Sequence, residues 1–332
     1  MTITTPLPIE PDIEPPETPT GPPGPKGPRP AQGAKGGPMG RHRGSWFVRI
    51  AIILVVALWL VPTLGVLITS FRPEALSDRT GWWTALGHPF RAGEWTLENY
   101  RLALDTGGFK NAFLNSLAVA IPSTVIPVTI AAFASYAFSW MQFRGRHVMF
   151  VLVVGLMVVP LQMALIPILR LYTQGAELWG VTLIPDFNLN GTFLGIWLAH
   201  TGFGLPLATY LLRNYIGSLP SSIIESAKID GADHFTIFWR LVVPLSVPAL
   251  AAFAIFQFLW VWNDLLVAYV FLGATRDTRV VTIALANLVG SRGENWHLLT
   301  SAAFITMALP LAVFFSLQRY FVRGLTAGSV KG

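Results

Sequence analysis

At 332 residues the chain is 53% hydrophobic and only 12% charged, whereas a soluble domain carries roughly 25% charged residues, so the composition excludes an ordinary soluble protein. The formal net charge of +6 is not the footprint of nucleic-acid binding, because the basic residues gather at the ends of apolar segments. Cysteine is absent and the six histidines are scattered without ligand spacing, which excludes a disulfide framework and makes a metal site unexpected.

Residues 1–44 form a tail of different composition. Nearly half of the 25 prolines lie within the first 40 residues, with a Gly-Pro run at 21–28. Proline prevents regular helix, glycine adds chain entropy, and little apolar surface is available to bury. We therefore predict a disordered cytosolic tail, which a solvated role explains better than a partner motif. It is not a signal peptide, because no apolar region follows a short basic start.

Six stretches lack Asp, Glu, Lys and Arg and are long enough to cross the ~30 Å hydrocarbon core as helices. They are residues 50–71, 111–143, 147–169, 187–212, 241–263 and 295–318. The fifth is expected to continue past Asp264 to Leu272. The sequence thus predicts an all-α integral membrane protein with six transmembrane helices in one bundle, within a permease domain at 45–323.

Arginines indicate which span ends face the cytoplasm. They are Arg41, Arg43, Arg49, Arg144, Arg146, Arg213, Arg319 and Arg323. By the positive-inside rule, both termini are then cytoplasmic. The segment 72–110 lies outside, where its aromatic residues fit a small cap at the membrane interface.

Prolines predict bends in the second and third spans. Pro122 and Pro127 interrupt the second span, where neighbouring helices must satisfy the carbonyls that proline leaves free. A small-residue run at 131–135 allows close helix packing there. The third span carries Pro160, Gln162 and Pro167, which indicates a bent helix with a polar face.

The polar loop 214–245, between the fourth and fifth spans, is predicted to form two short helices. Ser222 and Glu225 have the spacing of a capping box. The first helix is expected to end near Asp230, with Gly231 in the left-handed conformation. Asp233 then caps the second helix.

The same loop presents an apolar ridge and two bracketing prolines. Ile223, Ile224 and Ala227 lie on one helical face, which suits a partner's groove. Pro220 and Pro244 are expected to bound the unit.

The loop carries a motif that resembles a known family. Its elements are Glu225-Ser226-Ala227, then Gly231, then Leu241-Val242-Val243-Pro244, and they resemble the EAA signature of ABC-importer permeases, with conservative departures at Ser226 and Val243. Asn115-Ser116-Leu117, the Pro160/Gln162/Pro167 pattern and Trp262-Asn263-Asp264 resemble the carbohydrate-uptake branch. The ending, 324–332, resembles the C-terminal tail of the second (G-type) permease of maltose-type importers.

The resemblance implies a type I ABC importer permease fold in the cytoplasmic membrane, and a transport subunit rather than an enzyme. It implies a second permease, two copies of an ABC ATPase and an extracytoplasmic sugar-binding protein as partners. ATP and Mg²⁺ would be bound by the ATPase, with no cofactor on this chain, which lacks a Gly-x-x-x-x-Gly-Lys-Ser/Thr loop. The imported sugar would be an α-glucoside or a maltose-like oligosaccharide.

The resemblance also assigns roles to residues. Those that would dock on the ATPase are Glu225, Ser226, Ala227, Gly231 and Pro244. Those of the tail that would insert between the two ATPase subunits are Gly324, Thr326, Gly328, Ser329 and Lys331. The outer loop 273–297 would reach into the binding protein.

Four polar residues of the spans are candidates for the sugar pathway: Asn115, Gln162, Asn263 and Asp264. Asp264 is the only carboxylate within a predicted span, and a charge in hydrocarbon normally faces a cavity or a partner. Its place near the outer end of the span favours a hydrogen-bonded cap over contact with sugar. Trp260 and Trp262 fit sugar stacking or, more commonly, anchoring at the interface.

Other functions remain open at this point. An ion-coupled secondary carrier usually places carboxylates at mid-membrane in repeated halves, and the sequence shows neither. A membrane scaffold leaves the loop and the C-terminal tail unexplained. An ABC permease for a solute other than sugar fits the loop equally well.

Overall fold

The computed structural model describes residues 44–105, 108–288 and 295–326, with side chains described for 46–318 within these ranges. The predicted tail 1–44 therefore lies outside the described residues apart from its last position, as do Gly328, Ser329 and Lys331. The chain divides into two compact units, Met1–Leu58 and Trp59–Gly332. In the first unit the described part is helical, and its side chains from 46 to 58 are exposed and apolar apart from Arg49.

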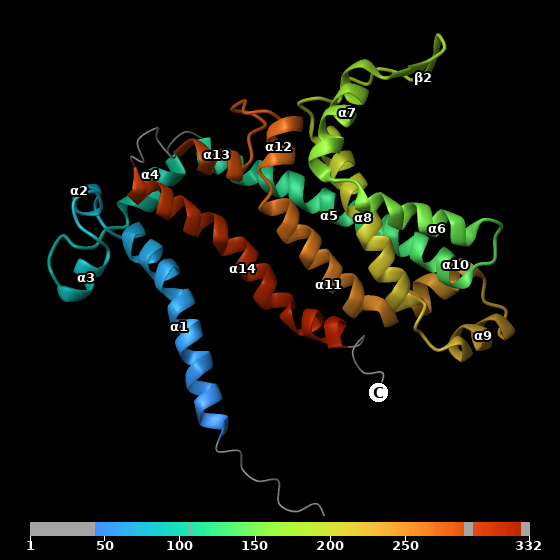
Figure 1. The fold of residues 1–332 in the computed structure, drawn as a ribbon, viewed down its shortest axis with the longest axis horizontal. Coiled ribbons are helices and arrows are strands. Elements are labelled where there is room, and N and C mark those ends of the chain that lie inside the picture. The colour runs from blue at the N-terminus through green and yellow to red at the C-terminus, as the bar shows by residue number, and fades with distance from the viewer. Residues whose placement is uncertain (1–43, 106–107, 289–294, 327–332) are drawn as a thin grey trace, which may run out of the picture. The chain divides into compact units, whose positions relative to one another are not determined.

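The described residues are mostly helical, which confirms the all-α prediction (Figure 1). In chain order the first elements are α1 (Gly44–Ser70), α2 (Glu74–Ser77), α3 (Trp83–Gly87), α4 (Glu98–Asp105), α5 (Phe109–Trp140), α6 (Arg146–Gly155), η2 (Leu156–Val158) and α7 (Leu161–Gln174). A hairpin follows, made of β1 (Ala176–Leu178) and antiparallel β2 (Val181–Ile184). The remaining elements are α8 (Phe193–Ile216), α9 (Ser221–Ile229), α10 (His234–Ile237), η3 (Phe238–Val242), α11 (Val243–Trp262), α12 (Leu266–Phe271), α13 (Val281–Leu288) and α14 (Trp296–Thr326).

Among the described residues, four helices are long and apolar enough to cross a membrane: Trp46–Ser70, Phe109–Trp140, His234–Trp262 and Trp296–Gln318. The predicted third span forms α6 and η2, followed by α7, and counts as a fifth crossing only as a pair bent by 106°. Pro160 precedes α7 at this bend. The predicted fourth span forms α8, whose 24 residues are long enough to cross but include His200, Arg213 and Asn214.

Two span boundaries were predicted wrongly. The fifth span does not continue to Leu272, because the helix ends at Trp262 and α12 begins anew at Leu266. The fourth span does not begin at residue 187, because the chain reaches the helix through a turn at Gly191 and the N-cap Thr192, whose Oγ1 accepts a hydrogen bond from the amide of Gly195 at 3.1 Å. The sixth helix also runs beyond the predicted residue 318, to Thr326, so the tail residues Gly324 and Thr326 lie within it.

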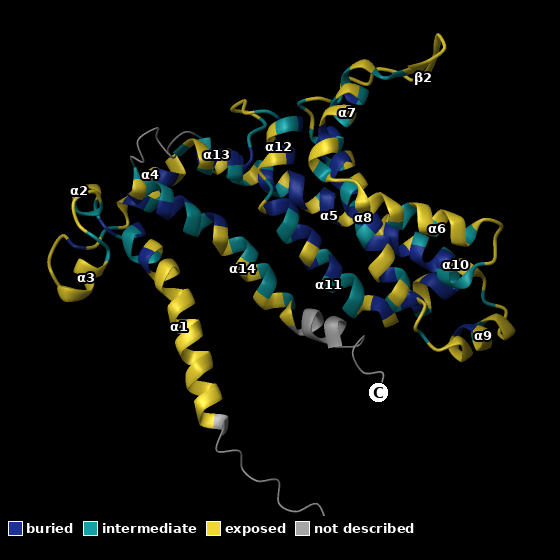
Figure 2. Cartoon of the chain, viewed as in Figure 1, coloured by how far each residue is buried: buried dark blue, intermediate teal, exposed yellow. Residues whose placement is uncertain are grey.

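Helix α5 is the centre of the packing in the second unit. It packs against α8 and α11, and α11 lies side by side with α14 (Figure 1). The buried residues gather on α5, α8 and α11 (Figure 2). The predicted small-residue run provides part of this contact, since Ala131, Ala132 and Ser135 are buried while Phe133 is exposed.

Three prolines within helices have their freed carbonyls satisfied by side chains of neighbouring helices. A proline cannot donate to the carbonyl four residues earlier. For Pro122, that carbonyl, on Ala118, accepts from Nε1 of Trp197 at 2.9 Å. For Pro127, the carbonyl of Ser123 accepts from Nε2 of Gln257 at 3.2 Å. The expectation for the second span is therefore confirmed at both prolines.

The third case joins α11 to α14. Pro310 leaves the carbonyl of Thr306 free, and Nε1 of Trp262 donates to it at 3.2 Å. Trp262 is 2% exposed. Its indole is therefore committed to packing, so neither sugar stacking nor anchoring at the interface describes it.

The segment after α1 folds around a buried arginine. Arg72 pairs with Glu94 at 3.1 Å, with both side chains buried, and its guanidinium also donates to the carbonyls of Thr80 and Gly81. A buried ion pair is tolerated when such additional hydrogen bonds complete it. The segment is thus folded around this ion pair, which is consistent with a small cap; its place at the outer membrane interface stays a prediction.

The end of α1 is bound into this cap. The carbonyl of Ser70 accepts from Nδ2 of Asn99 and from Oγ of Ser301, each at 3.0 Å. Helix ends leave carbonyls without partners inside the helix. Here α4 and α14 together supply the missing donors.

Candidate coupling and transport sites

The predicted coupling loop contains the helix α9 and a left-handed turn. Helix α9 ends at Ile229 with Asp230 as its C-cap. Gly231 follows with a φ of 81°, and the amide of Ala232 donates to the carbonyl of Ala227 at 2.9 Å. The predicted end of the helix and the left-handed glycine are both confirmed.

The capping box is wrong. Pro220 is the N-cap of α9 and no side chain caps this end, so Ser222 lies inside the first turn. The amide of Glu225 then belongs to the regular ladder of the helix, where it bonds the carbonyl four residues earlier. It is not available to the hydroxyl of Ser222.

Asp233 caps the next helix as predicted, with Oδ1 accepting from the amide of Thr236 at 2.8 Å. Hydrogen bonds from the side chain and the amide of Thr236 hold the pKa of the Asp233 carboxyl below its usual value. The prediction that Pro244 bounds the unit, however, is wrong. The helix continues from α10 through the wide turns of η3 into α11, with Pro244 in the first turn of α11, so Pro244 does not bound the loop.

The exposed surface of the loop differs from the predicted ridge. Ile224 is 2% exposed and packs in the core with Ile216 and Phe238, so it cannot meet a partner. Ile223, in contrast, is exposed as predicted and lines the depression described next. Ile229, Phe235 and Trp239 also face outward. Glu225 and Ser226 are exposed, Ala227 is half-buried, and Ser226 and Ala227 line an open depression of about 440 Å³ on α9.

The candidate pathway residues are not brought together. Nδ2 of Asn115 donates to the carbonyls of Asp277 and Arg279 at 2.7 and 3.0 Å. Gln162 is exposed on the first turn of α7, and the exposed Asn263 donates back to the carbonyl of Leu259 in its own helix. No single cavity is lined by all four candidates among the described pockets.

Asp264 has the geometry of a hydrogen-bonded cap. Its two carboxylate oxygens accept from the amides of Val267 and Ala268 at 3.2 and 2.8 Å, at the start of α12. Its carbonyl accepts from Oγ1 of Thr282 at 2.6 Å, next to the start of α13. Asp264 therefore organises the break after α11.

The sequence reasoning missed His200, which lies beside Asp264. Its side chain is fully buried on α8, with Nε2 at 3.8 Å from Oδ2 of Asp264 and the ring edge-on to Trp260. A cavity of about 10 Å³ adjoins both side chains. The sequence signal that could have revealed this contact is a histidine inside an apolar span, which normally faces a cavity or a polar partner.

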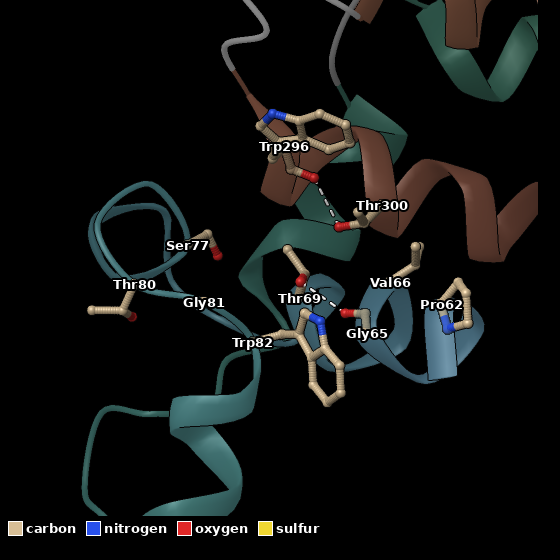
Figure 3. Close-up of a pocket in the computed structure, with 10 residues that line it drawn as sticks. All are labelled: Pro62, Gly65, Val66, Thr69, Ser77, Thr80, Gly81, Trp82, Trp296 and Thr300. Atoms are coloured by element: carbon tan, nitrogen blue, oxygen red, sulfur yellow. Dashed lines mark hydrogen bonds between the residues drawn. The ribbon is translucent and has the colours of Figure 1, made fainter. Parts of the chain in front are cut away.

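Two larger hollows lie at other places in the second unit. One, of about 310 Å³, lies between the C-terminal part of α1 and the start of α14, where Trp82 and Trp296 accompany Thr69 and Thr300 (Figure 3). The other, of about 530 Å³, is lined mainly by apolar residues at the α6–α7 bend and by Trp260. None of the predicted site residues lines either hollow.

Comparison with known proteins settles the family. The family described as binding-protein-dependent transport system inner membrane component matches residues 113–327, well over half of the chain. The chain belongs to this family. It is thus a multi-pass membrane subunit of a transport system rather than an enzyme, as the resemblance implied.

Two curated relatives and one solved structure show how this permease compares. It is 57% identical to the osmoprotective compounds uptake permease protein GgtD of Synechocystis sp., over 86% of this chain and 91% of the relative. It is 44% identical to the alpha-glucoside transport system permease protein AglG of Rhizobium meliloti, over 89% and 99%. A chain of a bacterial ABC transporter that imports the acidic polysaccharide alginate matches at a TM-score of 0.64 and 19% identity, covering 86% of this permease and all of that chain. This likeness confirms the type I ABC importer permease fold.

Proposed function

We propose that this permease is one of two membrane subunits of an ABC importer for an α-glucoside or a maltose-like oligosaccharide. The observation that carries this proposal is the 44% identity to an alpha-glucoside permease over nearly the full length of both chains. Family membership argues against the ion-coupled carrier and the scaffold.

A second candidate substrate class has its own support. The relative named for the uptake of osmoprotective compounds is more similar, at 57% identity. Under this alternative the importer takes up osmoprotective solutes, and α-glucosides are transported poorly or not at all.

The energy would come from two copies of an ABC ATPase that bind ATP and Mg²⁺ and dock on the coupling loop. The exposed Glu225 and Ser226, the depression beside them and the exposed Ile229 and Phe235 support this docking. The exposed Ile223 lines this depression, which is the kind of apolar surface that a partner can cover. The loop and both termini are then cytoplasmic, and the C-terminal tail inserts between the ATPases.

On the outer side an extracytoplasmic binding protein would deliver the sugar to the pair of permeases. We expect the 273–297 loop to contact it. Of the four pathway candidates, Gln162 and Asn263 fit best, because they are exposed. Asn115 and Asp264 are already engaged by backbone groups of neighbouring segments.

Uptake in a strain that lacks the chromosomal permease gene tests the substrate class. The strain is complemented with the wild-type gene, or with Gly231→Val as an inserted but uncoupled control. Radiolabelled maltose and other α-glucosides should enter saturably and compete with one another. Uptake of osmoprotective solutes alone would establish the second candidate, and uptake of neither would show that the substrate class is wrong.

A further inference from the structure

The last two turns of α5 hold the coupling loop at its start and at the beginning of α10. Before the loop, Oγ of Ser135 donates to the carbonyl of Thr209 at 3.1 Å, and Nε1 of Trp140 donates to the carbonyl of Ile216 at 3.1 Å. Ile216 is the last residue of α8, where carbonyls lack helical partners. The C-terminal end of α8, from which the loop begins, is therefore fixed to α5.

The second helix of the loop is held by Tyr136, which follows Ser135. Its hydroxyl lies 2.9 Å from Nδ1 of His234, the first residue of α10. The tyrosine ring is 4% exposed and packs edge-on against His234 and Phe238. Tyr136 is buried whereas His234 is exposed, so the hydrogen bond ties the start of α10 to the buried face of α5.

The other end of α5 holds the outer loop. In addition to the two bonds from Asn115, Oγ of Ser116 accepts from the amide of Val281 at 2.8 Å. This amide opens α13. The segment 277–281 is therefore fixed to the outer end of α5, about 32 Å from Tyr136 at the helical rise.

Between these ends α5 is stiffened where its prolines would weaken it. The bonds from Trp197 and Gln257 to the freed carbonyls replace the two helix bonds that Pro122 and Pro127 remove. Prolines inside helices otherwise make kinks.

We propose that α5 is the rigid connection between the ATPase-facing and the binding-protein-facing loops, with Tyr136 and Asn115 as positioning residues at its two ends. Tyr136 passes movement of the coupling loop into α5, and Asn115 passes it to the segment 277–281. The inference rests on the proposed function insofar as the coupling loop docks on an ATPase. It does not depend on which solute is carried.

The test uses the complete transporter, and exploits the absence of cysteine from this chain. A spin label at Ala274→Cys, an exposed position in the outer loop, reports movement when a non-hydrolysable ATP analogue is added. The other subunits are prepared without reactive cysteines. Tyr136→Phe keeps the ring and removes the hydroxyl, and Tyr172→Phe does the same at a buried tyrosine of α7 that packs on Phe271.

In Tyr136→Phe we expect the equilibrium between the nucleotide-free and nucleotide-bound label positions to shift about fivefold toward the nucleotide-free position, the change in equilibrium constant for losing one typical hydrogen bond. Assembly and basal ATP hydrolysis should stay at wild-type levels, and Tyr172→Phe should respond as wild type. Asn115→Ala should reduce the response in the same way. His234→Ala combined with Tyr136→Phe should reduce it no more than His234→Ala alone.

A full label response in an assembled Tyr136→Phe complex would overturn the inference. So would an equal loss in Tyr172→Phe, because the effect would then be a general one of removing a buried hydroxyl. If the wild-type label never responds to nucleotide, ATPase coupling itself fails. If the wild-type label responds but no α-glucoside is imported, only the proposed substrate fails.

Discussion

Gly231 shows how a single residue sets the geometry of the coupling loop. Its φ of 81° lies in the left-handed region, and a Cβ built there meets nothing within 4 Å. A side chain at this position therefore suffers backbone strain without a clash. Within this chain, the effect of a substitution can therefore be ascribed to the turn rather than to a clash.

We predict that Gly231→Val abolishes uptake while the chain still inserts into the membrane. The left-handed conformation costs a non-glycine residue about 1–2 kcal/mol, and a β-branched side chain is disfavoured there, so α9 should shift relative to α10. Gly145→Val is the matched control, because Gly145 has a φ of 82° and equally open surroundings but lies in the turn before α6. Transport assays and membrane fractionation of both variants decide the matter, and normal uptake by Gly231→Val would refute the coupling role.

Residue-level prediction succeeded where the rule is local. The left-handed Gly231 and the cap of Asp233 depend on a few neighbouring backbone atoms, and both were read correctly from the sequence. The capping box predicted at Ser222 was wrong because the N-cap is Pro220, two residues earlier. The spacing of Ser222 and Glu225 does not reveal this. Tyr136 was missed because its partner, His234, lies 98 residues away in the chain.

At the scale of elements, the side chains that serve proline-freed carbonyls explain how α5 stays continuous. Gln257 is fully buried between α5 and α8, and the absence of a side chain at Gly204 leaves room for it. A Cβ at Gly204 would lie 2.6 Å from Nε2 of Gln257. A glutamine at position 257 of α11 is therefore explained by a proline in α5, whose freed carbonyl it bonds.

We predict that Gln257→Leu lowers the free energy of unfolding by about 1–3 kcal/mol, since the buried carbonyl of Ser123 loses its donor. In a Pro127→Ala background the loss should be smaller, because the amide of Ala at position 127 can donate to that carbonyl. Pro122→Ala, whose freed carbonyl is on Ala118, should give no such rescue. Thermal unfolding of the purified protein in detergent measures all these variants, and equal losses in the three backgrounds would show that Gln257 acts otherwise.

The elements themselves were predicted unevenly. Apolar length located the long helices, because hydrocarbon thickness imposes that length on any sequence. The break after Asn263 was missed, because it depends on Asp264 capping α12 and on the bond from Thr282. The 106° turn at Pro160 exceeds what the sequence indicated, since a proline predicts a bend but neighbouring elements decide its angle.

At the scale of the whole molecule, the two tails are expected to differ in importance. Deletion of residues 2–40, with Arg41, Arg43 and Arg49 kept, should preserve topology and uptake, because the segment has little apolar content with which to dock. Uptake and reporter fusions at both termini measure this. Loss of transport despite normal expression would reveal a partner of the tail.

The C-terminal tail is expected to contact the ATPases. Helix α14 carries the chain as far as Thr326, and the glycines and small residues that follow suit an extended path through a narrow cleft. Ser329→Cys, in this chain without cysteine, should crosslink to an ATPase subunit in the assembled complex. Free reaction with a soluble maleimide and no crosslink would contradict the insertion.

The shared carbonyl of Ser70 has a consequence for how the protein is made. Its donor from Ser301 lies 231 positions further along the chain, which a ribosome needs roughly 10–50 s to add. Throughout that interval α1 is already synthesised, while the carbonyl of Ser70 at the end of this helix lacks its contact with Ser301, whose hydroxyl it shares with the carbonyl of His297. We therefore expect the folded segment after α1 to be completed only after α14 has been inserted. A nascent chain arrested before residue 301 should be recognised by membrane proteases as unfinished.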